Sequence, residues 1–318
     1  MKLPVSFIIL AVLLLLALFF LVLPYRRDIQ AAYRKLENME RQTIQTACGP
    51  IEVALRGEGE PVLVSHGIAG GFDQSLGLVE AHLSPGMLAI APSRFGYLGT
   101  PMPAESSPVA QADAYVCLLD ALKIDQVSIL ANSAGGTSAI QMALRYPQRV
   151  KALILVSSAA PSTAVSMISL PPKPVIQFVF GSDFLLWLLT TKFSGMMHAT
   201  VGVPEGYPLS AADQELVSGL IRSILPIQPR QAGFVFDMFT SNLDMDQHPE
   251  LYPLEQLRMP TLVMAALDDP LAKYENAKAM ADRIPNAQLY TFPSGGHLLL
   301  GSGDTAREEI ERFILSLR

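Results

Sequence analysis

The sequence predicts an α/β fold: a doubly wound, mostly parallel β-sheet with a helical insertion, preceded by one transmembrane helix. Short apolar runs alternate with helical patterns over residues 61–156, which is typical of parallel βαβ units. The alternation stops over residues 161–259, where apolar residues recur at helical spacing, and resumes at residue 260. An uncharged, almost entirely apolar run covers residues 3–24.

The N-terminal run is long enough to cross a bilayer, because a spanning helix needs about 20 apolar residues. A signal peptide usually has a shorter apolar core and a small-residue cleavage site, whereas this run ends in Val22-Leu23-Pro24. We therefore expect an uncleaved single-pass anchor. Basic residues gather after the run, so the positive-inside rule favours a cytoplasmic location for the rest of the chain. These residues are Arg26, Arg27, Arg34, Lys35 and Arg41.

The composition points to a globular protein attached to a membrane. Half of the 318 residues are hydrophobic and the net charge is −6, with no basic cluster beyond the N-terminal region, so we expect no nucleic-acid partner. Cys117 lies in an apolar helical pattern, far from Cys48. We expect a buried thiol rather than a disulfide, which fits a reducing compartment.

The alternation of patterns divides the chain into five segments. The expected segments are a transmembrane anchor (1–24), a juxtamembrane connector (25–41), the two parts of an α/β core (42–160 and 260–318) and a helical cap (161–259).

Residues 126–136, read as QVSILANSAGG, form the stretch most suggestive of chemistry. An apolar strand pattern is followed by small residues around Ser133 and then by a helical pattern, which is the context of a nucleophile elbow. At the helix start, the backbone N–H of Ala134 is placed to bind a developing oxyanion. The same letters also fit a Ser/Ala/Gly-rich turn without chemistry.

A serine nucleophile needs a base and an orienting carboxylate. Of the five histidines, His297 directly follows the last predicted strand, and open α/β sheets place their sites at the carboxyl ends of strands. Asp268 and Asp269 follow the strand at residues 261–266 in the same way, although an Asp-Asp-Pro sequence also suits a turn. The serine–acid–histidine order is the one expected of α/β-hydrolases.

With these motifs in place, residues 43–318 resemble the α/β-hydrolase superfamily. The resemblance implies that the backbone N–H of Ile68, in the loop after His66-Gly67, is a second oxyanion donor beside Ala134. It aligns Ala266 with a family glycine, which makes Asp269 the triad acid. It also places the insertion at the family's cap position. The sequence departs from the family pattern in having Ala131 and Ala266 where glycine is usual.

We therefore expect a membrane-anchored serine hydrolase, resembling esterases and lipases, that cleaves a small-molecule or lipid-like ester through Ser133, Asp269 and His297. The Phe-, Leu- and Met-rich insertion suits an apolar acyl group, although these residues also suit packing of the cap onto the core. Hydrolysis of a carbon–carbon bond in a vinylogous diketone, or of a thioester, would use the same triad. A catalytically silent, membrane-tethered binding protein is the non-enzyme alternative. No cofactor or metal is implied, because the sequence shows neither a dinucleotide-binding nor a metal-ligand motif.

Overall fold

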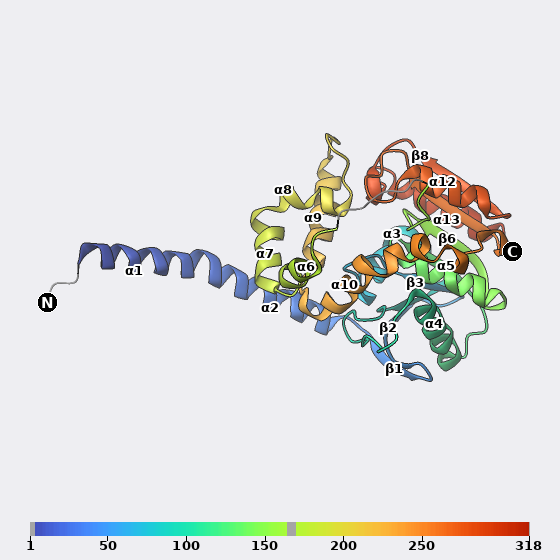
Figure 1. Ribbon diagram of the computed structural model, residues 1–318, viewed down its shortest axis with the longest axis horizontal. Helices are drawn as coiled ribbons and strands as arrows, with labels where there is room; N and C mark the ends of the chain where they lie inside the picture. The colour runs from blue at the N-terminus through green and yellow to red at the C-terminus, as the bar shows by residue number, and fades with distance from the viewer. Residues whose placement is uncertain (1–3, 164–169, 318) are drawn as a thin grey trace.

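The protein, seen here in a computed structural model, is described over residues 4–163 and 170–317 (Figure 1). In this part of the chain one eight-stranded sheet has the order β1-β2-β4-β3-β5-β6-β7-β8. Strands β3 to β8 are mutually parallel, and the β1–β2 hairpin adds two antiparallel strands at one edge. The strands are β1 (Gln42–Thr46), β2 (Gly49–Arg56), β3 (Glu60–Ser65), β4 (Met87–Pro92), β5 (Val127–Asn132), β6 (Val150–Val156), β7 (Thr261–Ala266) and β8 (Ala287–Phe292). The predicted mostly parallel sheet is confirmed.

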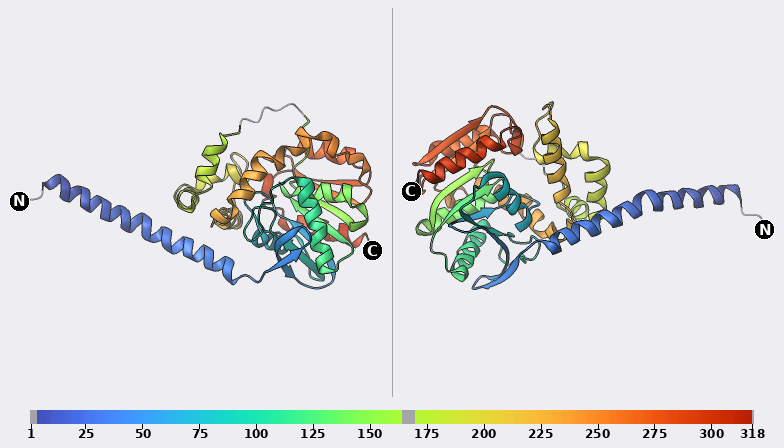
Figure 2. Two further views of the ribbon diagram at one scale, coloured as in Figure 1. Left: turned by 60° about the horizontal axis from the view of Figure 1, so that its bottom comes forward. Right: turned by 180° about the vertical axis from the view of Figure 1, so that it is seen from behind.

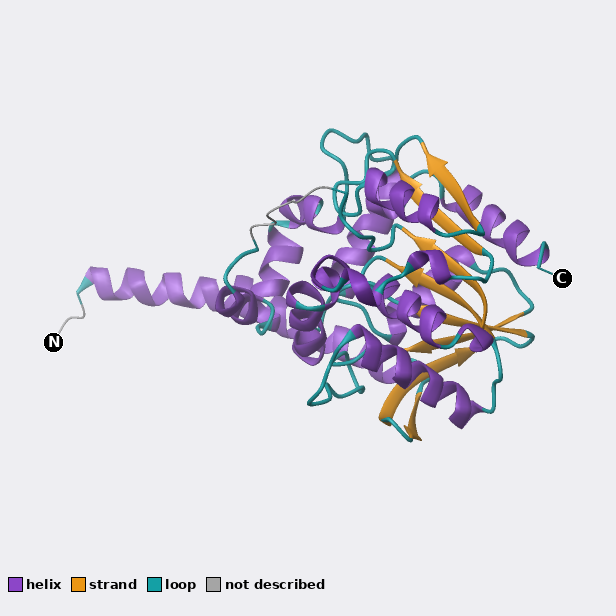
Figure 3. Ribbon diagram, turned by 45° about the vertical axis from the view of Figure 1, so that its right-hand side comes forward, coloured by secondary structure: helices purple, strands orange, loops and turns teal. Residues whose placement is uncertain are grey.

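Helices cover both faces of the sheet, as a doubly wound fold requires (Figure 3). One face packs against α4 (Pro108–Leu122), α5 (Gly135–Arg145) and α12 (Tyr274–Arg283), and the other packs against α3 (Phe72–His82) and α13 (Gly303–Leu315). Helix α4 shows how the sequence sets a boundary. Ser107 accepts a hydrogen bond from the Ala110 N–H at 3.0 Å, and Pro108 occupies the first helical position, where its missing N–H costs nothing.

Between β6 and β7 the described residues form helices and loops that sit beside the carboxyl ends of the strands (Figure 1). We call this set the cap; residues 164–169, which belong to the predicted cap segment, lie outside the described residues. The cap helices are α6 (Lys173–Val179), α7 (Asp183–Lys192), α8 (Ser194–Met197), α9 (Ala211–Ser223), α10 (Gln231–Phe239) and α11 (Asp244–Gln247). Short 3₁₀ turns join them at η3 (Ala199–Val201), η4 (Gln228–Arg230), η5 (Ser241–Leu243), η6 (Pro249–Leu251) and η7 (Leu254–Gln256); elsewhere lie η2 (Pro147–Arg149) and η8 (Gly296–Leu298).

The N-terminal segment forms one continuous helix from Val5 to Asn38 that projects away from the body of the protein (Figures 1 and 2). It comprises α1 (Val5–Ala17), a π-helical turn η1 (Leu18–Val22) and α2 (Leu23–Asn38). This helix is long and apolar enough to cross a membrane, and its most apolar part touches nothing else in the described structure. Its second half differs in character, because α2 packs against α7 of the cap.

The two cysteines are joined in a disulfide, with 5.9 Å between their Cα atoms. Cys48 lies in the turn between β1 and β2, and Cys117 lies on α4. The expectation of a buried free thiol at Cys117 is therefore wrong: its side chain is only half-buried, on the side of α4 that faces the hairpin turn. Because the two cysteines are 69 positions apart in the chain, the cross-link would restrict the unfolded chain by about 4 kcal/mol in the chain-entropy account.

Candidate active site

Ser133 occupies a sharp turn between β5 and α5. Its φ of +50° is rare for a residue with a side chain, so the surrounding contacts must hold the backbone there. They do so on both sides of the residue: its N–H donates to the Val156 carbonyl at 3.2 Å, and its carbonyl accepts from the N–H groups of Gly136 and Ala159 at 3.0 and 2.9 Å. The half-buried serine side chain is thus held at the carboxyl end of the sheet.

Small residues after the serine allow this turn. A Cβ atom at Gly135 would collide with the carbonyl oxygen of Ser65, and one at Gly136 would overlap the hydroxyl oxygen of Ser158. Ala131 stands on the strand side, fully buried, where the family usually has glycine. The elbow therefore tolerates a methyl group at position 131, two residues before the serine, but not at positions 135 and 136, two and three residues after it.

His297 joins Ser133 to Asp269. It lies in η8, just after β8, with its Nε2 2.9 Å from the serine Oγ and its Nδ1 2.9 Å from the Asp269 Oδ2. The other oxygen of Asp269 accepts the backbone N–H groups of Leu271 and Ala272 at 2.8 and 2.9 Å, which fixes the carboxylate. Because Asp269 and His297 are buried, this chain of hydrogen bonds is shielded from water up to the serine.

Asp268 takes a different role from its neighbour. Its two oxygens accept the backbone N–H groups of Gly295 and Gly296 at 3.2 and 2.9 Å. Asp268 thus holds the loop that carries His297, while Asp269 contacts the imidazole ring itself. The local sequence pattern fits both aspartates. In the structure it is Asp269 that contacts the histidine.

The cap also contacts this loop. The carbonyl oxygen of Gly202, directly after η3, accepts the backbone N–H of His297 at 3.0 Å. Gly202 has a φ of +83°, and a Cβ atom there would collide with the Cβ of His297. Glycine is therefore required at this position both by its backbone conformation and by its close approach to the histidine.

The two expected oxyanion donors lie on either side of Ser133. Ala134 is the residue at the start of α5, and the loop that carries Ile68 follows β3 and passes so close that a Cβ at Gly67 would be 3.1 Å from the serine Cβ. Among the described residues, neither the Ala134 nor the Ile68 N–H donates to a protein acceptor. Both donors are thus available to a ligand oxygen, with the positive end of the α5 dipole behind one of them.

A buried polar cluster supports the Ile68 loop from behind. Arg94 donates to the carbonyl of Gly67 at 3.3 Å and forms a two-point ion pair with Asp237 of α10. The backbone N–H of Arg94 donates to Nε2 of His66 at 3.0 Å, while Nδ1 of that ring lies 2.7 Å from the Gly67 carbonyl. Burial, followed by the charge of Arg94, lowers the pKa of His66, so the ring is neutral and holds its proton on Nδ1.

Tyr97 completes this cluster. Its hydroxyl donates to Asp237 at 2.5 Å and accepts the backbone N–H of Ala69 at 3.3 Å. Burial, and then the charge of Asp237, raise the pKa of Tyr97, which keeps the hydroxyl protonated. This cluster was not predicted from the sequence. The run Ser93-Arg94-Phe95 after β4 was visible, but no pattern connects it with an aspartate 143 positions later.

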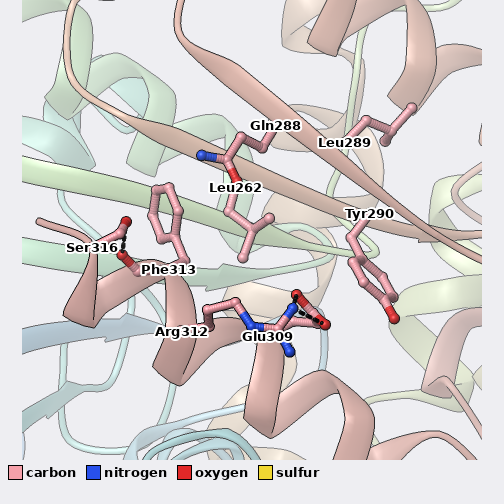
Figure 4. A pocket seen from close by; sticks show the side chains of 8 residues that line it. All are labelled: Leu262, Gln288, Leu289, Tyr290, Glu309, Arg312, Phe313 and Ser316. Atoms are coloured by element: carbon pink, nitrogen blue, oxygen red, sulfur yellow. Dashed lines mark hydrogen bonds and ion pairs between the residues drawn. The ribbon is translucent and has the colours of Figure 1, made fainter.

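Two pockets of the described structure lie in different places. One lies between α13 and the strands β7 and β8, beside the Glu309–Arg312 ion pair and away from the serine (Figure 4). The other is a groove of about 500 Å³ between the cap and the loop after β7. It is lined by Gly195, His198, Val203, Tyr207 and Pro270 among others, and Pro270 directly follows Asp269. Over the described residues, no three His, Cys, Asp or Glu side chains form a group that could hold a metal ion.

Comparison with known proteins agrees with this geometry. The chain matches the alpha/beta hydrolase fold family over residues 60–185 and 239–304, and it belongs to that family. It is therefore a hydrolase of the α/β-hydrolase fold.

Individual relatives cover most of the chain. It is 28% identical to a poly(3-hydroxyalkanoate) depolymerase of Ectopseudomonas oleovorans, over 89% of this chain and 92% of that one. It is 27% identical to a 2-hydroxymuconate semialdehyde hydrolase of Pseudomonas putida, over 81% and 85% of the two chains. Among solved structures, an α/β-hydrolase fold protein of Nakamurella multipartita superposes with a TM-score of 0.69 at 28% identity, covering 86% of this chain and 98% of that one.

The adjacent aspartates provide an internally controlled test of the site. We expect Asp269→Asn to lower kcat by about 10³–10⁴-fold, because the imidazole loses the carboxylate that fixes its tautomer and stabilises its charged form. Asp268→Asn should cause a much smaller loss, because it acts only through the loop backbone. Steady-state kinetics of both variants, with melting temperatures to verify folding, measure the difference. A larger kcat loss in the Asp268 variant would reverse the two assignments.

Proposed function

We propose that the protein hydrolyses carboxylic esters with Ser133 as nucleophile, His297 as general base and Asp269 as the orienting acid. One observation carries the proposal: the continuous chain of hydrogen bonds from Asp269 through His297 to Ser133, at 2.9 Å per step. A serine held in a strained turn and hydrogen-bonded to a buried histidine is poised for nucleophilic attack. The backbone N–H groups of Ile68 and Ala134 are the proposed oxyanion donors.

The chemistry proceeds in two steps. As the Ser133 oxygen attacks the ester carbonyl, Nε2 of His297 takes the hydroxyl proton, and the oxyanion forms between the two N–H donors. Each donor contributes about 10²–10³-fold to the rate in comparable sites. The tetrahedral intermediate expels the alcohol, which receives the proton from His297 and leaves an acyl-serine. Water, deprotonated by the same histidine, then releases the carboxylic acid and restores the serine.

An apolar acyl group is the substrate feature that the surroundings of Ser133 favour. Ile68, from the proposed oxyanion loop, and Leu298, next to His297, pack into the same apolar cluster as Leu186 and Trp187 of the cap. This cluster forms an apolar surface near the serine, which is suited to binding a hydrocarbon chain. The similarity to a poly(3-hydroxyalkanoate) depolymerase supports an ester as the cleaved bond.

Carbon–carbon bond hydrolysis is the second candidate, because relatives include a 2-hydroxymuconate semialdehyde hydrolase. The name of that substrate denotes a carboxylate, which would need a cation in the pocket. The two buried arginines near the proposed oxyanion loop are already engaged, Arg94 with Asp237 and Arg230 with Asp73. This pairing favours a neutral ester. A thioester would fit the same triad, and a silent binding protein would have no need of the aligned serine and histidine.

We also propose that residues 1–24 anchor the chain as a single transmembrane span, that 25–41 connect it to the body, and that the core (42–160, 260–318) carries the cap (161–259). The charge asymmetry favours the cytoplasmic side for the catalytic domain. The disulfide between Cys48 and Cys117 favours the opposite side, because disulfides persist in oxidising compartments and are rare in a reducing cytosol. Because a disulfide is rarely maintained in a reducing compartment, whereas the charge rule is a statistical tendency, we infer that the domain faces the oxidising side.

Ser133→Ala tests whether the protein is an enzyme. The wild type should be labelled covalently by a fluorophosphonate probe and the variant should not, because the probe reacts only with an activated serine. Gel fluorescence measures the labelling, and circular dichroism checks that the variant is folded. If the wild type is not labelled, the silent binding protein is the better account; if the variant is still labelled, another residue is the nucleophile.

A series of p-nitrophenyl esters tests the acyl group. We expect kcat/KM to rise with chain length from acetate to medium-length chains, because each additional buried CH₂ adds about 0.8 kcal/mol of transfer free energy. A preference for acetate would contradict the apolar acyl group while leaving ester hydrolysis intact. In parallel, turnover of a vinylogous diketone in preference to every ester would favour the second candidate.

The side of the membrane can be tested in cells that express the full chain. Lysis in the presence of an alkylating agent, followed by non-reducing peptide mass spectrometry, should recover the Cys48–Cys117 peptides linked. A C-terminal tag should be accessible to protease without disruption of the cytoplasmic membrane. Alkylated cysteines together with a protected tag would place the domain in the cytoplasm.

A further inference from the structure

The point at which the N-terminal helix leaves the bilayer lies against the cap. Residues 5–24 are helical and carry no charge; at 1.5 Å per residue they span the roughly 30 Å of a hydrocarbon core, so Tyr25 marks the membrane surface. The Tyr25 ring contacts Phe184 and Trp187 of α7, with ring centroids 5.2 and 5.6 Å apart. Helix α7 therefore lies at the level of the membrane interface, where Tyr and Trp are commonly enriched.

Helix α2 is bound to the cap rather than loosely tethered to it. The Trp187 indole N–H donates to Asp28 at 3.0 Å, and the Tyr33 hydroxyl donates to Asp183 at 3.0 Å. Ile29 is buried in the same apolar cluster as α7. Because these contacts fix α2 on the cap, the direction of the spanning helix also fixes which face of the cap is turned to the membrane.

The cap helices near α7 carry exposed apolar side chains. Phe178 of α6 and Met196 of α8 are 71% and 70% exposed, and Val175 and Phe193 are about half exposed. We call these four residues the apolar face. They belong to the cap, which lies on the side of the molecule from which α1 projects (Figures 1 and 2). On a protein surrounded by water, such a group of exposed apolar residues marks an interaction site.

The charges around the apolar face suit a bilayer. Over residues 159–204 the one acidic residue is Asp183, and it is buried by its bonds to α2 and to the backbone N–H of Ile227. Lys173 and Lys192 of the same segment are exposed. Within residues 170–204 the exposed side chains are thus aromatic, aliphatic, polar or basic, which matches the hydrocarbon and phosphate layers of a membrane interface; the next acid, the exposed Glu205, lies in the lining of the groove.

We propose that the apolar face docks into the leaflet that α1 enters, and that substrate reaches Ser133 from the lipid phase. The groove between the cap and the loop after β7 is the proposed path: its lining includes Gly195, which precedes Met196 in the chain, and Pro270, which follows Asp269. Docking rests on the proposed membrane span, and the route rests on the proposed ester hydrolysis. The substrate class is therefore a bilayer-resident ester with an apolar acyl chain.

Depth measurements on the full chain in lipid nanodiscs test the docking. A polarity-sensitive fluorophore is attached at Phe178→Cys, Met196→Cys or, as a matched control, Leu315→Cys, which is equally apolar and 49% exposed on α13. The native cysteines are joined to each other and do not compete for the label. We expect nitroxides on the lipid chains to quench the label at 178 and 196, and aqueous iodide to quench it at 315. Iodide quenching at all three positions would overturn the docking, whether or not the protein is an esterase.

An activity comparison tests the route. The double variant Phe178→Ser/Met196→Ser should lose at least about tenfold of its activity on a long-chain ester embedded in nanodiscs. It should keep its activity on a water-soluble short-chain ester and its labelling by fluorophosphonate, which verifies the fold. Leu315→Ser should change neither activity. If the double variant keeps its long-chain activity, or loses both activities equally, entry from the lipid phase is wrong. A wild type that hydrolyses no ester would overturn the proposed function and this route together, and leave the depth result standing.

Discussion

The buried ion pair between Arg94 and Asp237 is the contact on which the arrangement of the site depends. Arg94 follows β4 in the core and Asp237 lies on α10 of the cap, and both side chains are almost fully withdrawn from water. Removing one partner of such a pair costs about 3–5 kcal/mol, because the other charge is left buried and uncompensated. The cap therefore cannot leave the core without exposing or stranding a charge. The same arginine donates to Gly67, so the position of the cap and the shape of the proposed oxyanion loop are set together.

A second buried aspartate, Asp183, links the cap to the N-terminal helix. Asp183 accepts the Tyr33 hydroxyl of α2 with one oxygen and the backbone N–H groups of Ile227 and Gln228 with the other. Helix α2, the cap and the core are thus linked in series by two carboxylates, each satisfied by several donors. Arg230, fully buried beside Asp73, ties the cap to the start of α3 as well. The spanning helix, the cap and the site are therefore held in a fixed mutual arrangement.

The sequence was informative where the signal is local. The order of strands and helices follows from apolar periodicity, and the three proposed triad residues each lie just after a strand, where an open sheet concentrates its sites. The choice between Asp268 and Asp269 was harder, because both occupy the same turn and differ only in which atoms they reach. The contacts of Arg94, Asp183 and Asp237 could not be predicted, because charged residues normally indicate exposed positions and their partners are distant in the chain.

Two further features show where a local pattern misleads. The apolar neighbours of Cys117 belong to the buried side of α4, whereas the cysteine itself is half-buried and faces the hairpin turn that carries Cys48. The residues 25–41 read as a charged connector, yet α2 uses Asp28, Ile29 and Tyr33 to pack on the cap. In both cases the residues on one side of a helix make the contact. The average composition of the segment does not reveal which side that is.

The hydrogen bond from His297 to the Gly202 carbonyl bears on how the enzyme can admit and release molecules. If the cap swung away as a rigid body, it would break this hydrogen bond and displace the backbone of His297, the proposed general base. The site would then be disrupted each time the cap opened. Passage of substrate and product through the groove beside the cap would avoid that conflict. If substrate enters through the proposed groove, the reactive groups can stay assembled throughout the cycle.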